Sequence, residues 1–249
     1  MEGLKVLRST QIIILGVCFV IATIVSTVIF SKGLLQIKKF SQEVISVTGS
    51  AEKKIESDYI VWNSGFSRRN PVLKDAYSSI QEDLKKVKSY LLSKGIKEDE
   101  IVVSQIETEI LYKKNEKGNN TNEIEGYLLS QVIEVKSNDV KRIEEVSRQS
   151  TELIDQDIQF ISAAPEYFYT KLAELKVEML AMATEDAKQR AISMAQSTGN
   201  KIGAIRSAQM GVFQITPVTS YDVSWYGRND TSSYEKKVMA VVSATFAIE

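Results

Sequence analysis

The run from Ser9 to Ser31 constrains the fold most, because it is largely apolar and contains no charged side chain. At about 1.5 Å per residue, a helix over this run crosses the roughly 30 Å hydrocarbon core of a bilayer. A removed signal peptide is the alternative, but its apolar region is usually shorter and is followed by a small-residue cleavage site. The run therefore predicts an uncleaved transmembrane helix that attaches the protein to a membrane through residues 9–31.

This span divides the chain into a cytoplasmic tail and anchor over 1–32, a linker over 33–43 and a single domain over 44–249. Basic residues flank the span about equally, at Lys5, Arg8, Lys32, Lys38 and Lys39. The positive-inside rule therefore does not decide the orientation. A very short N-terminal tail before a long C-terminal body, residues 44–249, is typical of a signal anchor. We therefore expect a single-pass protein of the cell membrane. Its C-terminal body is expected to be extracytoplasmic, either periplasmic or at the cell surface.

The body lacks the residues that most catalytic and metal sites use. The chain contains no histidine, and its single cysteine, Cys18, lies in the predicted span. The commonest general base and any thiolate ligand are thus missing from the body. Glycine-rich phosphate-binding motifs and nucleophile-elbow motifs are also absent. We therefore predict no catalytic residue, no cofactor, no metal and no enzyme activity.

The charge balance gives information about partners. The formal net charge of the chain is −1, and the body contains no block rich in lysine and arginine. Proteins that bind nucleic acid normally carry a basic face that neutralises phosphates. We therefore do not expect a nucleic-acid partner.

The first half of the body alternates between strand and helix periodicity. Residues 38–66 favour two strands with a break near Gly49 and Ser50. Apolar residues at steps of three and four predict a helix after them, with Asn70 as N-cap, Pro71 at its first position and Gly95 beyond its end. These apolar residues are Val72, Ala76, Ile80, Leu84, Val87 and Leu91.

Two strands and a second helix come next. A strand over 100–112 and a strand over 123–136 are expected to form a hairpin, because the polar segment between them carries Gly118 and several asparagines. Asn138 is expected to cap a helix, and a short strand follows near 158–161. The order from Ile55 to Ile161 is then β-α-β-β-α-β, which indicates a split β-α-β antiparallel sheet with its helices on one face.

The last part of the chain predicts a long helix and a C-terminal β-hairpin. An alanine-rich helix is expected over 166–198, and it either lies on the sheet as a core helix or also contacts a neighbouring subunit. Residues 201–215 and 237–248 favour a final strand pair. The predicted fold class is therefore α+β, preceded by one transmembrane helix.

A long connection over 216–236 separates the two final strands. It carries four aromatic side chains, Tyr221, Trp225, Tyr226 and Tyr234, on a background of polar residues. Connections of this length are usually functional or disordered, and exposed aromatic residues favour a partner-contact surface. Folding of the rings onto their own domain is the alternative.

Five motifs in this order resemble the SIMPL-domain family. They are VISVTGSAE (44–52), LLSKGIKEDEI (91–101), IEGYLLSQVIEV (124–135), ATEDAKQRAISMA (183–195) and the closing β segment. The family includes periplasmic immunogenic and outer-membrane-associated antigens of the bacterial envelope, and the resemblance covers 43–249. It implies an exported α/β domain, ring-like or channel-like homo-oligomers, a link to envelope or oxidative stress, and no catalytic residues to transfer. The long anchor differs from the cleavable signal of many relatives.

We therefore expect a membrane-anchored, extracytoplasmic, oligomeric scaffold or interaction protein of the cell envelope without catalytic activity. An envelope-stress binding or chaperone-like module that takes up apolar ligands is one alternative. An unrecognised hydrolase is another.

Overall fold

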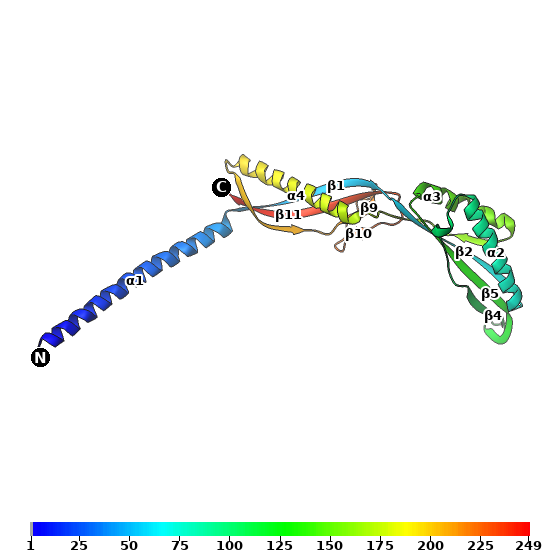
Figure 1. Ribbon diagram of the computed structural model, residues 1–249, viewed down its shortest axis with the longest axis horizontal. Coiled ribbons are helices and arrows are strands. Elements are labelled where there is room, and N and C mark those ends of the chain that lie inside the picture. Colours follow the sequence, from blue (N-terminus) through cyan, green and yellow to red (C-terminus); the bar gives the residue numbers. More distant parts are fainter. Residues whose placement is uncertain (1) are drawn as a thin grey trace. The chain divides into compact units, whose positions relative to one another are not determined.

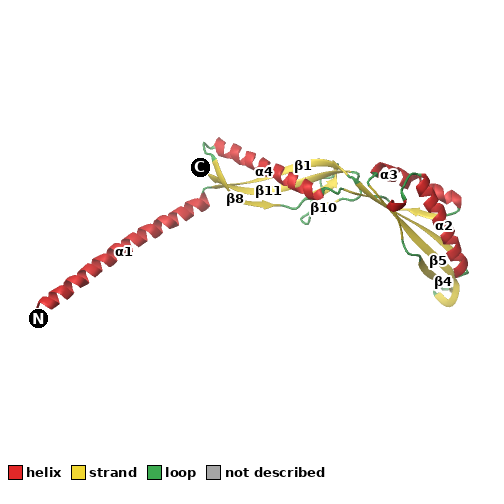
Figure 2. Cartoon of the chain, in the orientation of Figure 1, coloured by secondary structure: helices red, strands yellow, loops and turns green. Residues whose placement is uncertain are grey.

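The computed structural model describes the backbone of residues 2–249 and the side-chain surroundings of residues 14–37 and 43–249. The chain divides into two compact units, described separately here. One comprises the chain up to Ala51 with 180–211 and 241–249, and the other comprises 52–179 and 212–240. Most of the elements are labelled in Figure 1, and all are coloured by type in Figure 2.

In chain order the elements are α1 (Glu2–Gln42), β1 (Val44–Glu56), β2 (Tyr59–Asn70), α2 (Leu73–Ser93), the 3-10 helix η1 (Glu98–Glu100), β3 (Ile101–Val103), β4 (Glu107–Lys114), β5 (Asn120–Ser137), α3 (Val140–Gln149), the 3-10 helix η2 (Ser150–Gln156), β6 (Gln159–Ser162), β7 (Glu166–Phe168), α4 (Leu172–Ser197), β8 (Ile202–Met210), β9 (Gln214–Pro217), β10 (Arg228–Asn229) and β11 (Glu235–Ile248). This combination of helices and strands confirms the predicted α+β fold class.

Helix α1 contains an apolar stretch long enough to span a membrane. Residues Ile14–Ile37 form 24 helical residues, within which an 18-residue window has a mean hydropathy of 2.5, and their side chains are exposed throughout. The side chains of residues 9–13, at the start of the expected span, lie outside the description. Residues 33–42, the greater part of the expected linker, are helical. The helix is compatible with a transmembrane or signal anchor, and the domain boundaries at 32 and 43 remain predictions.

The second unit contains the predicted split sheet. Strands β5 and β2 lie at its centre and pair antiparallel. Strands β3 and β4 both pair with β5, and β6 and β7 both pair with β2, all antiparallel. The predicted four strand positions are therefore present, and two short strands fill each outer position.

Helices α2 and α3 cover one face of this sheet. Alternate residues of β2 and β5 point toward the helices, as expected for strands with one covered face. The core cluster joins Ile60, Trp62 and Phe66 of β2, Leu129, Ile133 and Val135 of β5, Ala76, Ile80, Val87 and Leu91 of α2, and Val140, Ile143 and Val146 of α3. Burial of a Leu, Ile, Val or Phe side chain of this kind contributes about 1.5–3 kcal/mol.

Helix α2 confirms the predicted apolar stripe but begins later than expected. The side chain of Asn70 accepts a hydrogen bond from the Val72 amide at 2.9 Å. This bond forms an Asx turn ahead of the helix, so Asn70 is not the residue that caps it. The helix begins at Leu73 without a side-chain cap. Gly95 follows its end with φ +84°, in the left-handed region that the sequence indicated.

Two further details of this unit differ from the sequence prediction. Asp139 caps α3, because its carboxylate accepts from the Arg142 amide at 3.2 Å, and Asn138 precedes the cap. The strand expected over 100–112 is interrupted after Val103. At this point the Ser104 hydroxyl accepts from the Val132 amide at 3.0 Å, and the Ser104 amide donates to the Val132 carbonyl at 2.9 Å.

The first unit confirms the final strand pair and the alanine-rich helix. Residues Val242–Ile248 of β11 pair antiparallel with β8, and β1 lies on the other side of β11. Alanines of α4 pack on these strands in a cluster formed by Val47, Ala187, Ala191, Ala244 and Phe246. This packing is the expected core-helix arrangement.

The predicted break at Gly49 and Ser50 is wrong, because β1 runs without interruption through both residues. A Cβ atom at Gly49 would lie 2.3 Å from the Ala183 carbonyl oxygen of α4. Glycine is therefore needed for close approach of strand and helix, and not for a turn. The Ser50 amide donates to the Asp186 carboxylate at 2.8 Å, and this bond lowers the pKa of Asp186.

The helix expected over 166–198 is shorter at its start. Residues Glu166–Phe168 form β7 and pair with β2, so α4 begins only at Leu172. Gly199 follows the helix with φ +78°.

Candidate partner-contact loop

The predicted contact residues lie on the connection between β9 and β11, residues 218–234, called the aromatic loop below. Three of the four are almost fully exposed, Tyr221 at 90 %, Trp225 at 95 % and Tyr226 at 97 %. The side chain of Val223 between them is also exposed. Large aromatic side chains that gather on an exposed surface mark interaction sites. The loop therefore exposes three aromatic rings at the surface, where a partner can contact them.

Hydrogen bonds fix the part of the loop that carries these rings. The buried amide of Gln214 donates to the Ser224 carbonyl at 2.7 Å and accepts from the Ser224 amide at 3.2 Å. Arg228 forms an ion pair with Asp222 at 2.6 Å, and β10 pairs in parallel with β9. Because both ends of this segment are tied to the sheet, the exposed rings are held in place by their backbone.

Tyr234, the fourth predicted residue, does not belong to this surface. Its hydroxyl donates to the Glu56 carboxylate at 2.7 Å, and its ring packs edge-on against Tyr167 with centroids 6.2 Å apart. The hydrogen bond to Glu56, followed by burial, raises the pKa of Tyr234. The sequence prediction therefore grouped Tyr234 wrongly with the three exposed rings of the contact surface, since its ring packs against its own unit.

Sequence reasoning missed Lys236, which holds the C-terminal end of the loop. Lys236 is only 2 % exposed. Its ammonium group donates to the Tyr167 carbonyl at 2.8 Å and to the Asp230 carbonyl. Burial lowers the pKa of Lys236, although the nearby Asp230 charge acts in the opposite direction. No sequence signal could have found this residue, because lysine is almost always exposed.

A polar pocket of about 450 Å³ lies beside the loop. It is lined by Ile215, Thr216, Pro217, Ser220, Asp222, Arg228, Asn229, Asp230, Thr231 and Ser232. One carboxylate oxygen of Asp230 is buried without a hydrogen-bond partner. Burial raises the pKa of Asp230, but hydrogen bonds from Ser232 and Ser233 and the charge of Lys236 together outweigh burial, so the net shift is downward. The lining suits small polar groups and offers no imidazole or thiol for catalysis.

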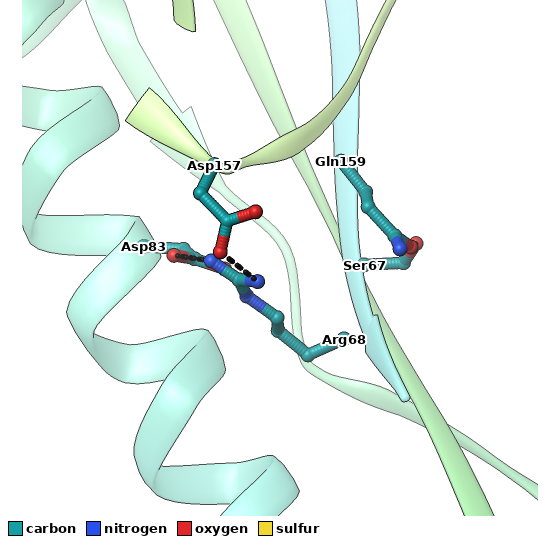
Figure 3. Close-up of polar contacts among 5 residues, drawn as sticks. All are labelled: Ser67, Arg68, Asp83, Asp157 and Gln159. Carbon is teal, nitrogen blue, oxygen red and sulfur yellow. Dashed lines mark hydrogen bonds and ion pairs between the residues drawn. The ribbon is translucent and has the colours of Figure 1, made fainter. Parts of the chain in front are cut away.

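A charged cluster in the same unit joins β2 to two other elements (Figure 3). The Arg68 guanidinium contacts the buried carboxylate of Asp83 on α2 through Nε at 2.5 Å and Nη2 at 2.9 Å. Its Nη1 atom contacts Asp157 at 3.2 Å. The Asp83 hydrogen bond raises the pKa of Arg68. Because the guanidinium stays charged and paired, the cluster stabilises the fold and provides no acid or base.

Within the residues that the structure describes, no group of three or more histidine, cysteine, aspartate or glutamate side chains is arranged to hold a metal ion. The expected lack of catalytic, cofactor and metal residues remains a prediction.

A comparison with protein-family models matches residues 45–246 to one family. The chain belongs to the SIMPL family. The family model describes a protein of unknown function, DUF541. The match confirms the resemblance that the five sequence motifs indicated. No curated protein matches the chain.

The SIMPL match begins in β1 and ends in β11, so it covers parts of both compact units and the whole aromatic loop. Helix α1 lies outside the matched residues. The SIMPL domain is therefore the body of this protein, and the apolar helix is a segment in addition to it.

Proposed function

We propose that this SIMPL protein is a membrane-anchored interaction protein of the cell envelope, without catalytic activity, whose body lies outside the cytoplasm. It acts as an oligomeric scaffold through contacts that its aromatic loop makes. The anchor attaches the body to the membrane, and the loop supplies the contact energy.

The apolar part of α1 supports the anchor. A helix of 24 residues is about 36 Å long at 1.5 Å per residue, which is enough to cross the hydrocarbon core with some tilt. Its exposed side chains have no cover within the described chain, and lipid would cover them.

The observation that carries the proposal is the exposure of Tyr221, Trp225 and Tyr226 on a segment that is fixed by hydrogen bonds. Rings held in this way lose little conformational entropy when they become buried in a partner. Tyrosine and tryptophan also dominate the energetic centres of protein interfaces. Oligomerisation of the body is consistent with this surface and with the family resemblance.

The test is the double variant Trp225→Ser with Tyr226→Ser in the full-length protein in uncharged detergent. We expect the molar mass from light scattering to fall to that of a smaller species, while the circular dichroism spectrum stays unchanged. Ile154→Ser, which removes an exposed apolar side chain elsewhere in the same unit, is the control and should leave the mass unchanged. An unaltered mass in the double variant would contradict the proposed role of the loop.

A further inference from the structure

Strand β4 has a free edge. It pairs with β5 on one side, and in the part of the chain that the structure describes no strand pairs with its other side. An unpaired edge offers a row of backbone N–H and C=O groups that an added strand can use. The geometry of this edge therefore suits an extended peptide.

An apolar groove of about 630 Å³ lies between the start of α2 and the paired strands β4 and β5, on the face of the sheet that carries the helices. It is lined by Leu73, Lys74, Tyr77, Ile106, Thr108 and Leu129. Helix α2 packs on β2 and β5, and its Leu73 and Tyr77 side chains, which line the groove, remain 43 % and 53 % exposed. A strand added to β4 would bring alternate side chains into this groove.

The opposite face of the same edge is acidic. Glu107 and Glu109 alternate with Thr108 along β4, so they point away from the groove. Both are exposed, and no ion pair within the described residues involves either carboxylate. An added strand would place its other side chains beside these two charges, where basic residues are favoured.

We propose that the free edge of β4 binds an extended segment of another protein in which apolar and basic residues alternate. The segment pairs its backbone with β4, fills the groove with its apolar side chains and sets its basic side chains against Glu107 and Glu109. Antiparallel pairing with β4 of a second copy is disfavoured, because it would bring two rows of glutamates together on one face. This surface is separate from the aromatic loop and goes beyond the scaffold role.

The probe is a short fluorescein-labelled peptide of alternating valine and lysine, titrated into the full-length protein in uncharged detergent and followed by anisotropy. We expect saturable binding that weakens by about tenfold or more in Tyr77→Lys, which places a charge on the groove wall. Leu92→Lys adds the same charge at another exposed position of α2 and should bind as the unchanged protein does. Thermal unfolding of both variants checks that they are folded.

Two further arms separate edge pairing from attraction by charge alone. A peptide with glutamate in place of lysine, and a lysine peptide methylated on alternate backbone nitrogens, should both fail to bind. Glu107→Gln with Glu109→Gln should weaken the lysine peptide. The inference is overturned if the peptide does not bind the unchanged protein, if Tyr77→Lys binds equally well, or if a second copy of the chain is found on this edge.

This outcome is independent of the proposed scaffold role. The variant Trp225→Ser with Tyr226→Ser leaves the groove intact, so it should bind the peptide even where it no longer assembles.

Discussion

At the scale of single residues, two charged side chains of the SIMPL body, Lys236 and Asp83, are buried almost completely. Asp83 has the Arg68 guanidinium as its counter-charge, and removal of one partner from a buried pair costs about 3–5 kcal/mol in general. The ammonium group of Lys236 donates its hydrogen bonds to two backbone carbonyls, and the Asp230 charge nearby offsets burial only in part. Burial without a directly bonded counter-charge favours the neutral amine, which is why the pKa of Lys236 falls and that of Arg68 rises.

The shift at Lys236 predicts a pH dependence of stability. Its folded pKa lies below the ordinary value of 10.5, so between these two values the unfolded chain binds more protons than the folded chain. The free energy of unfolding should therefore increase as pH rises toward 10.5, and this gain is lost as pH falls through the folded pKa.

The measurement compares urea unfolding of the unchanged protein and Lys236→Met across this range. The difference between their unfolding free energies should shift in favour of the unchanged protein at higher pH. A difference that is constant with pH would show that Lys236 titrates alike in both states.

At the scale of elements, Gly49 decides whether β1 and α4 can pack. An added Cβ would meet backbone atoms of Ala183 and Ala187 at 2.3 Å, and backbone cannot move aside as a side chain can. Gly49→Ala should therefore destabilise the first unit by about 1–3 kcal/mol, the usual range for overpacking. Thermal unfolding measures this loss.

Gly65→Ala is the matched control, because it also lies within a strand. There the added Cβ would be 3.7 Å from the Gln131 carbonyl oxygen, an ordinary contact. Its stability should change by about 0.5 kcal/mol or less. Equal losses in the two variants would argue against the close approach at Gly49.

These elements also show what the sequence could predict. The spacing of Ala76, Ile80 and Val87 located α2, and the order of periodic segments located the split sheet, because both signals are local. Gly49 was read as a break, since local rules cannot show that a distant helix passes over it. Composition and length located the aromatic loop. Its exposure at Trp225, and the inward fold of Tyr234, depend on contacts that no local pattern encodes.

At the scale of the whole molecule, the proposed function depends on which side of the membrane carries the SIMPL domain. The basic residues on the two sides of the span do not decide this. A chemical label can test the side directly, because the chain has one cysteine, Cys18, within the apolar part of α1. A variant with Cys18→Ser offers a background without thiols.

On this background, Lys117→Cys places a thiol at the exposed tip of the hairpin between β4 and β5, and Glu2→Cys places one before the span. A membrane-impermeant maleimide added to intact spheroplasts should label the Lys117→Cys protein at once and the Glu2→Cys protein only after lysis. The reason is that a single helix of this length leaves its two ends in different compartments. The reverse pattern would put the body in the cytoplasm, and labelling of both thiols before lysis would mean that α1 does not span the bilayer.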